Sequence, residues 1–515
     1  MDSMTESKRE TERKYEPSSP GVDGLPDLSG AGPVASVTAA GVEELDAVYH
    51  DTADLRLAGS SATLRRRTGG PDAGWHLKLP LTGDTREEMR APLSDDVPEA
   101  LRELLLSRTR GARLRPVVRI RSTRAVRHLR DAEGAVLAEL SFDEVRADSL
   151  LPGGGRAEWR EVELELADGV RAELLDTVEK RFRKKGITRA DSPSKFVRAL
   201  RDTGAAAEGA QKSAHAASTA PGSPGRYVLA YLEQQVATLV ALDPAARRDL
   251  PDGVHRMRVT CRRLRSCLRS YRSVLDRRVT DPVRAELKWL AGELGVARDQ
   301  EVLRERLGAG LAGLPGDLVL GPAAARLRVW DVSRGDESRA HVREALSSDR
   351  YLRLLDALDG LLRQPPLRAG AAGKPARTMA KAVLKEYDRL AGHVEHALGL
   401  PPGPSRDAAL HQARKEAKKV RYAAEVARPV LGKPVKRLGK RTKAVQQLLG
   451  DHQDSVVAQE TLRELAVTAH AAGETSFTWG VLLGQERAGA RAREEELPSV
   501  WRTASDPALR SALAQ

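Results

Sequence analysis

A change in hydrophobic periodicity at residues 202–225 is the feature that most constrains the fold of this chain. The stretch, DTGAAAEGAQKSAHAASTAPGSPG, is small, polar and rich in Gly, Pro and Ser, which is typical of a flexible linker. Before it, short alternating segments separated by turn residues indicate a sheet-rich domain. After it, long segments with a 3.6-residue period indicate an all-helical domain. We therefore predict a multidomain α+β protein with its linker at 203–225.

The charge balance points to an anionic partner. The net charge is +13 and the isoelectric point is about 9.8, which favours nucleic acid, polyphosphate or an acidic membrane surface. No run of about 18 apolar residues and no apolar leader segment occurs, so no membrane span is predicted. Cys261 and Cys267 lie in one helical stretch, which fits a reducing compartment. We expect a cytoplasmic location.

The strand candidates of the first domain carry charges on one face. Glu10, Glu12 and Lys14 alternate in ETERKYE, and side chains that alternate along a strand share a face. The same parity recurs at Arg65 and Arg67, His76 and Lys78, Arg119 and Arg121, Asp143, and Glu161, Glu163 and Glu165. For one strand a solvated face is the simpler explanation. For the set, a barrel with these faces inward, filled by divalent cations and a polyanion, explains the sorting into acidic and basic strands.

These motifs resemble the CYTH family of triphosphate tunnel metalloenzymes. The resemblance rests on E-x-E-x-K at 10–14, L-R-x-R at 64–67, L-K-x-P at 77–80 and the later charged strands, and it spans residues 6–202. It implies an antiparallel eight-stranded barrel with flanking helices around a site for triphosphate and Mg²⁺ or Mn²⁺. The implied metal ligands are Glu10, Glu12, Glu161, Glu163 and Asp143, and the implied triphosphate-binding residues are Lys14, Arg65, Arg67, Lys78, Arg119, Arg121 and Lys195.

The resemblance also implies a reaction, the metal-dependent hydrolysis of a terminal phosphoryl group. Lys14 and Asp143 would be its catalytic residues, with Asp143 serving a second metal or orienting water. Whether Glu165 and Arg86 belong to the site or to the protein surface stays open. His76 is interpreted as a neighbour of the site rather than as a base. Adenylate cyclases and thiamine triphosphatases share the tunnel, so the substrate stays open.

Basic residues form a stripe along two helical segments of the second domain. The first stripe holds His255, Arg258, Arg262, Arg265, Arg269 and Arg272, and the second holds His411, Arg414, Lys418, Arg421 and Arg428, interrupted by Glu425. Like charges at these spacings cost roughly 0.2–0.5 kcal/mol per pair, so the stripes predict a bound anion. For the two histidines, phosphate contact and a structural role both stay open.

Two pairs of matching segments predict an internal two-fold repeat. Residues 254–266 match 410–422, and LGVARDQEV at 294–302 matches LGDHQDSVV at 449–457. The order and the offset are nearly the same in both pairs, which is typical of a duplicated unit. The predicted halves are residues 226–375 and 376–505.

This pattern, H-x-x-R-x-x-x-R/K-R/K-x-R followed by L-G-x-x-x-D, resembles the CHAD family over residues 226–505. The resemblance implies a helical bundle whose basic channel binds inorganic polyphosphate, and association with polyphosphate granules would be compatible with it. The implied polyphosphate-binding residues are His255, Arg258, Arg262, Arg263, Arg265, Arg269, Arg298, His411, Arg414, Lys415, Lys418, Lys419 and Arg421.

The function predicted from both resemblances is hydrolysis of inorganic triphosphate, polyphosphate or a related organic triphosphate, with the helical domain binding the polymer. A non-catalytic polyphosphate scaffold and a class IV-type adenylate cyclase remain alternatives. Nucleic-acid binding ranks lower, because base stacking needs aromatic residues and only Tyr271 and Tyr422 lie near the basic helices. No membrane partner is expected, and the oligomeric state stays open.

Overall fold

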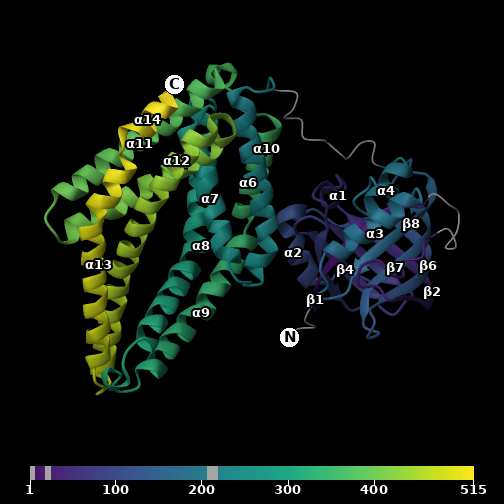
Figure 1. Ribbon diagram of the computed structural model, residues 1–515, viewed down its shortest axis with the longest axis horizontal. Coiled ribbons are helices and arrows are strands. Elements are labelled where there is room, and N and C mark those ends of the chain that lie inside the picture. The colour runs from purple at the N-terminus through teal and green to yellow at the C-terminus, as the bar shows by residue number, and fades with distance from the viewer. Residues whose placement is uncertain (1–5, 18–24, 206–218, 515) are drawn as a thin grey trace. The chain divides into compact units, whose positions relative to one another are not determined.

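The structure, a computed structural model, describes residues 6–17, 25–205 and 219–514. Internal contacts divide the chain into two compact units, Met1–Lys212 and Ser213–Gln515 (Figure 1). The first is built on a β-sheet and the second on helices, as the change in periodicity predicts. The predicted domain limits of 6–202 and 226–505 stay predictions.

The sheet of the first unit closes into the predicted eight-stranded antiparallel barrel. Its strands are β1 (Glu6–Glu16), β2 (Ser36–Asp51), β3 (Thr63–Thr68), β4 (Gly74–Pro80), β5 (Thr85–Ala91), β6 (Arg115–Arg130), β7 (Val136–Ser149) and β8 (Arg156–Leu166). They follow the order β5-β4-β3-β2-β6-β7-β8-β1, and pairing of β1 with β5 completes the ring. The two-residue strand β9 (Thr188–Arg189) adds to β1.

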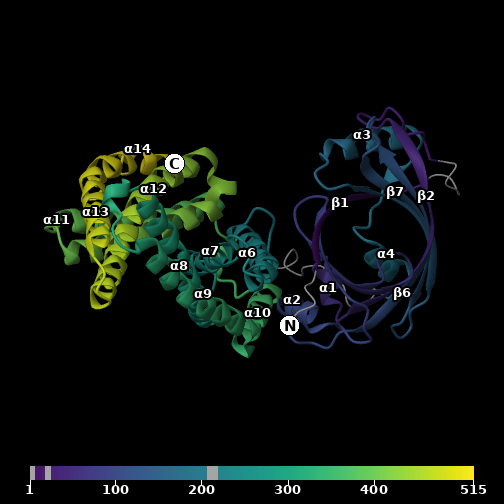
Figure 2. The same ribbon diagram turned by 90° about the horizontal axis from the view of Figure 1, so that it is seen from below.

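Helices cover the barrel and one of them enters it. The helices are α1 (Arg56–Gly59), α2 (Glu99–Thr109), α3 (Glu173–Lys184) and α4 (Lys195–Asp202). Figure 2 shows α4 within the ring of strands. Phe196 of α4 is fully buried and stacks on Tyr49 of β2, with 5.1 Å between the ring centroids. The interior of the barrel is therefore apolar where α4 lies.

The second unit is helical, as predicted. Its helices are α6 (Pro224–Arg247), α7 (Gly253–Ser270), α8 (Arg277–Ala312), α9 (Ala323–Ser347), α10 (Asp349–Arg363), α11 (Pro375–Gly399), α12 (Pro404–Ala471), α13 (Phe477–Ala504) and α14 (Pro507–Ala514), with short 3₁₀ turns η2 (Gly316–Leu318) and η3 (Ala369–Ala372). Across the described parts of the chain, we find no helix with the length and hydrophobicity needed to cross a membrane.

The apolar stripe beside the basic one holds α7 in the core of this unit. Met257, Cys261, Leu264 and Leu268 have almost no exposed surface and belong to one large hydrophobic cluster. Both cysteines are buried and free. Since the basic stripe lies one position further along the helix, burial of the apolar stripe fixes where the basic side chains point.

The matched sequence segments lie in α7 and α8 for the first copy and within α12 for the second. α12 is interrupted at Gly432, whose backbone has φ 54° and ψ −126°. The internal repeat itself stays a prediction.

Candidate functional sites: a charged tunnel and a basic pocket

The strand register turns one charged face of most strands into the barrel. A cavity of about 270 Å³ lies there. Its lining includes the predicted residues Glu10, Glu12, Lys14, Arg65, Arg67, Lys78, Glu163 and Lys195, together with Arg86 and Glu165, which the sequence left open. The expectation that these faces point inward is therefore correct for β1, β3, β4 and β8.

Three buried carboxylates form an acidic wall inside the barrel, and of these Glu163 is the one among the described cavity-lining residues. Asp143 on β7 pairs in register with Glu161 on β8, and Glu163 follows on the same face. One oxygen atom from each of the three lies within 4.8 Å of the others, close enough to share a metal ion. Oxygen-only donor sets of this kind suit Mg²⁺ and Mn²⁺.

Lys195, the first residue of α4, reaches this wall. Its Nζ atom lies 3.0 Å from Asp143 Oδ2, 2.8 Å from Glu161 Oε1 and 2.7 Å from Glu163 Oε1. Burial acts most strongly on the pKa of Asp143 and raises it, but the charges of Lys195 and Arg124 outweigh burial and leave the pKa well below its usual range. The carboxylate therefore stays ionised.

Strand β1 contributes one cation, Lys14, that contacts the acidic wall. It forms an ion pair with Glu163, and its Nζ atom lies 3.5 Å from Glu12 Oε1. Burial lowers the pKa of Lys14 to about 8, with the charge of Glu12 acting against this shift. An amine with this pKa can both hold and release a proton near neutral pH.

A basic wall stands across the tunnel from the acidic one. In the closed ring β3 is four strands from β8, so Arg65 and Arg67 face the side that carries Glu161 and Glu163. Lys78 on β4 pairs with Glu10 at 2.5 Å. Burial raises the pKa of Glu10 to about 6 against the opposing charge of Lys78. The tunnel thus places the guanidinium groups of Arg65 and Arg67 opposite the acidic triad.

Arg119 and Arg121 are not in the tunnel, and the prediction that they line it is wrong. They lie on the outer face of β6, about half exposed, and pair with Asp46 and Asp148. The inner face of β6 instead carries Ile120, which packs in the same cluster as Phe196 of α4. Apolar residues face inward at this level because α4 fills the barrel there.

The inward arginine of β6 is Arg124, which the sequence analysis missed. It lies 2.9 Å from Asp143 and 2.6 Å from Glu163 through different nitrogens. Glu88 on β5 was also missed, and it is buried between His76 at 3.0 Å, Lys78 at 3.7 Å and Arg65 at 3.8 Å. The alternation of Arg86, Glu88 and Arg90 in TREEMRA was an available signal for this strand.

His76 is buried and bonded on both ring nitrogens. Nδ1 lies 3.0 Å from Glu88, and Nε2 lies 2.8 Å from the backbone oxygen of Asp72. Burial lowers its pKa to about 4. These contacts support its interpretation as a neighbour of the site rather than as a base.

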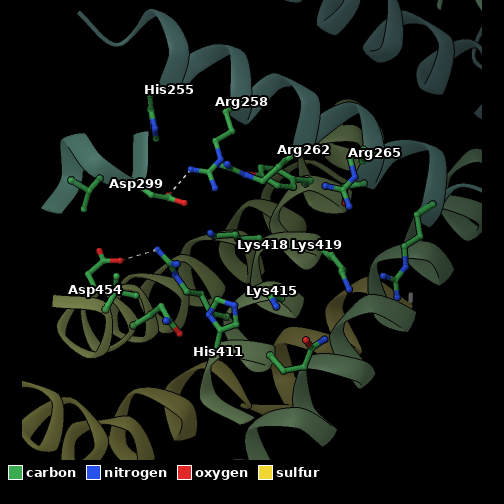
Figure 3. A pocket seen from close by; sticks show the side chains of 18 of the residues that line it. His255, Arg258, Arg262, Arg265, Asp299, His411, Lys415, Lys418, Lys419 and Asp454 are labelled. Atoms are coloured by element: carbon green, nitrogen blue, oxygen red, sulfur yellow. Dashed lines mark hydrogen bonds and ion pairs between the residues drawn. The ribbon is translucent and has the colours of Figure 1, made fainter. Parts of the chain in front are cut away.

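The second unit holds a basic pocket of about 900 Å³ between α7, α8 and α12. Figure 3 shows side chains of α7 facing those of α12 across it. Its lining includes the predicted residues His255, Arg258, Arg262, Arg265, Arg269, His411, Arg414, Lys415, Lys418 and Lys419, with Arg284 in addition and with Asp299 and Asp454 as acidic members. Residues of both matched segments therefore line one pocket.

A glycine makes room for an arginine on each side of the pocket. A Cβ atom on Gly295 would lie 3.2 Å from the guanidinium of Arg258, and one on Gly450 would lie 3.4 Å from that of Arg414. Arg258 pairs with Asp299 at 2.7 Å, whereas Arg414 lies 3.7 Å from Asp454. The L-G-x-x-x-D motif thus packs its glycine and its aspartate around one arginine.

Several cationic groups of the pocket are poorly compensated. Burial, followed by the charges of Arg414 and Arg262, lowers the pKa of Lys418 to about 7. Burial also lowers the pKa of His411. In the described residues, the buried Nε atoms of Arg262 and Arg414 form no hydrogen bond. A bound polyanion would supply both the charge and the acceptors that these groups lack.

Two predicted polyphosphate-binding residues with described side chains are not among those that line the pocket. Arg263 and Arg421 both pair with Glu425, at 3.0 and 3.7 Å, in an ion cluster of their own. Arg421 also donates to Gln446. The side chain of Arg298 lies outside the described residues.

Comparison with known proteins agrees with both resemblances. A model of the CYTH domain matches residues 8–200, and a model of the CHAD domain matches residues 230–463. The Mycobacterium tuberculosis (strain ATCC 25618 / H37Rv) protein named "Uncharacterized protein Rv2226" is 38% identical over 528 residues, which cover 98% of this chain and 97% of that protein.

Two solved structures are also similar. PptA from Streptomyces chartreusis is 25% identical with a TM-score of 0.46, over 54% of this chain and 99% of that chain. The CHAD domain from the plant Ricinus communis is 25% identical with a TM-score of 0.42, over 57% of this chain and 93% of that chain. The family models and the mycobacterial relative carry the assignment. This chain belongs to the family of proteins in which a CYTH domain is followed by a CHAD domain.

Proposed function

We propose that the tunnel hydrolyses the terminal phosphoryl group of inorganic triphosphate, polyphosphate or a related organic triphosphate, and that the helical pocket binds polyphosphate. One observation carries the proposal: a buried acidic triad faces a wall of arginines across a closed tunnel. Arginines match phosphate oxygens in bidentate geometry, and carboxylates hold the divalent cation that accompanies a polyphosphate chain.

The residues present fit a divalent cation. Asp143, Glu161 and Glu163 supply only oxygen donors and converge within 4.8 Å, which suits Mg²⁺ or Mn²⁺. Glu10 and Glu12 add carboxylates on the neighbouring strand β1. When bound, the cation would supply Lewis-acid stabilisation of the charge on the phosphate oxygens.

The protein's own groups would position the chain and move the proton. Arg65, Arg67 and Lys78 would hold the phosphates, so that a water oxygen adds to the terminal phosphorus while the bridging P–O bond breaks. Lys14, with its pKa lowered to about 8, is suited to give a proton to the departing phosphate oxygen and to take up in turn the proton that the attacking water loses. Asp143 would orient Lys195 and Arg124, which it holds by ion pairs.

The composition of the tunnel favours a triphosphatase over a cyclase. An adenylate cyclase needs a surface for the adenine ring, and the only aromatic residue among the described tunnel-lining residues, Tyr49, has one face covered by Phe196. The non-catalytic scaffold is disfavoured by the complete acidic triad. Nucleic-acid binding is disfavoured because Tyr422 is the only aromatic residue among those that line the described basic pocket.

The decisive experiment measures phosphate release by the purified protein with Mg²⁺ or Mn²⁺. The substrates are tripolyphosphate, long-chain polyphosphate, ATP and thiamine triphosphate. A Glu161→Gln/Glu163→Gln variant removes two carboxylate charges while keeping the side-chain volumes, and Arg121→Gln on the outer face of β6 is the matched control. Release that is lost in the double variant and kept in Arg121→Gln would establish the hydrolase. Polyphosphate binding without release from any substrate would favour the scaffold.

A further inference from the structure

A second group of metal-ligating side chains lies in the helical unit, apart from the tunnel. Asp407 on the first turns of α12, His452 in the second half of α12 and Glu494 on α13 converge so that one ligand atom from each lies within 4.8 Å of the others. Neither proposed activity uses these residues. His452 belongs to LGDHQDSVV, from which Gln453, Asp454 and Val457 line the basic pocket whereas His452 is not among the described lining residues.

The two separations that involve the imidazole match tetrahedral coordination. His452 Nε2 lies 3.3 Å from Asp407 Oδ1 and 3.5 Å from Glu494 Oε1. Two bonds of the length typical for Zn²⁺, set at the tetrahedral angle, place their ligand atoms about 3.4 Å apart. The right angles of octahedral Mg²⁺ coordination would place them about 3.0 Å apart.

The imidazole points an unsatisfied atom into this cluster. The side chain of His452 is 2% exposed, and among the described residues its Nε2 atom forms no hydrogen bond. Leaving a buried polar atom without a partner costs about 1–3 kcal/mol. A direct bond to either carboxylate would satisfy it, but the distances exceed normal hydrogen-bond lengths. A metal ion between the three groups would satisfy all of them.

The surroundings support a cation with one open coordination position. Arg406 Nε forms an ion pair with Glu494 Oε2 at 3.1 Å, and the other oxygen of this carboxylate lies 3.5 Å from His452 Nε2. The arginine offsets one of the two carboxylate charges, so the cluster stays negative. Asp407 is 32% exposed, which leaves a path for an ion and room for a water molecule as fourth ligand.

We propose that Asp407, His452 and Glu494 bind a divalent transition metal ion, with Zn²⁺ as the best fit. The ion ties both halves of α12 to α13. His411 lies one helical turn after Asp407, and Asp454 lies two residues after His452, so the same ion fixes two segments that line the basic pocket. Its role is structural support of the anion pocket, separate from any metal in the tunnel.

The test measures Zn²⁺ and Co²⁺ binding to the full-length protein after treatment with a chelator. Glu161→Gln/Glu163→Gln removes two of the three carboxylates of the tunnel triad and so weakens metal binding there, and the ligand variants below assign the remaining Zn²⁺ to the helical site. We expect one Zn²⁺ per chain, a Co²⁺ spectrum with the strong visible bands of tetrahedral coordination, and a higher melting temperature of the helical unit with Zn²⁺.

Three variants in this background decide the outcome. Glu494→Gln and His452→Gln each remove a ligand with little change in volume and should weaken Zn²⁺ binding by about tenfold or more. Asp451→Asn, next to the site but not part of it, should bind like its parent. The proposal is overturned if Zn²⁺ affinity is equal in the parent and in folded Glu494→Gln, or if Zn²⁺ shifts no melting transition. Circular dichroism shows whether each variant is folded. One folded ligand variant, Glu494→Gln or His452→Gln, is enough to decide the test.

Discussion

Among single residues, Arg124 and Arg121 form a matched pair on opposite faces of β6. Arg124 contacts Asp143 and Glu163 inside the tunnel, whereas Arg121 pairs with Asp148 outside. Arg124→Gln should lower kcat/KM for the substrate by about 100-fold, because a preorganised charge next to the reacting phosphate is lost. Arg121→Gln should stay within about twofold of the wild type, and steady-state phosphate release measures both. Equal losses in the two variants would contradict the placement of β6.

Lys418 should make the proposed polyphosphate binding depend on pH. Its pKa is lowered to about 7 by burial and by Arg414, Arg262 and Arg258, while Asp454 acts in the opposite direction. A polyanion favours the charged amine, so binding takes up a proton above pH 7 and weakens as the pH rises. We expect affinity about tenfold lower at about pH 8 than at about pH 6.

The Lys418→Arg variant is the control for this pH dependence. Its guanidinium stays charged over the whole range, so its affinity should change much less between these pH values. Titration calorimetry in buffers of different ionisation enthalpy also counts the protons taken up. An unchanged pH dependence in Lys418→Arg would assign the effect to other groups, with His411 as the first candidate.

Which face of a strand carries the site could be predicted only in part. The parity of β1, β3, β4 and β8 gave Glu10, Arg65, Lys78 and Glu163 correctly, because charges recur at every second position of these strands and, in β4 and β8, apolar residues alternate with them. On β6 the same rule selected Arg119 and Arg121, which is wrong. Because α4 fills the barrel at that level, the inward-facing residues of β6 are apolar there and the charged ones lie outside. The contact between α4 and β6 joins residues far apart in the chain, and parity within one strand does not contain it.

Among the elements, α12 is interrupted at a position whose backbone conformation favours glycine. Gly432 has φ 54° and ψ −126°, a conformation that side chains with a Cβ atom rarely adopt, although a Cβ atom placed there would meet no described atom within 4 Å. Gly432→Ala should therefore lower the free energy of unfolding by about 1–3 kcal/mol through backbone strain alone. Gly439→Ala, in a regular part of α12, should instead raise it by up to about 1 kcal/mol. Denaturant unfolding followed by circular dichroism compares the two variants.

Hydrophobic periodicity predicted which segments are helices and which are strands. It did not predict the interruption of α12. Gly432 lies in a long helical pattern between Pro429 and Pro434, and prolines and glycines occur in other helices of this unit without such a break. What sets the backbone there is the packing of both halves of α12 against neighbouring helices. That packing is tertiary, so local sequence signals do not specify it.

At the scale of the whole molecule, the two units carry proposed phosphate-binding sites of different kinds. The tunnel is small and balanced in charge, and it suits the end of a chain together with a cation. The pocket is larger and strongly basic, and it suits an internal stretch of a polymer. Because one polypeptide carries both, a polymer held by the pocket raises the effective concentration of its ends at the tunnel.

This tethering predicts that pocket variants affect long and short substrates differently. Arg262→Gln/Arg414→Gln should raise KM for long-chain polyphosphate by about tenfold, because the tethering contribution is lost, and should leave KM for tripolyphosphate unchanged. kcat should be the same for both, since neither arginine lies in the tunnel. Arg263→Gln, outside the pocket and paired with Glu425, is the matched control and should leave both KM values unchanged. Equal changes for both substrates would indicate that the variant disturbs the tunnel, and no change for either would mean that the pocket does not deliver polymer to it.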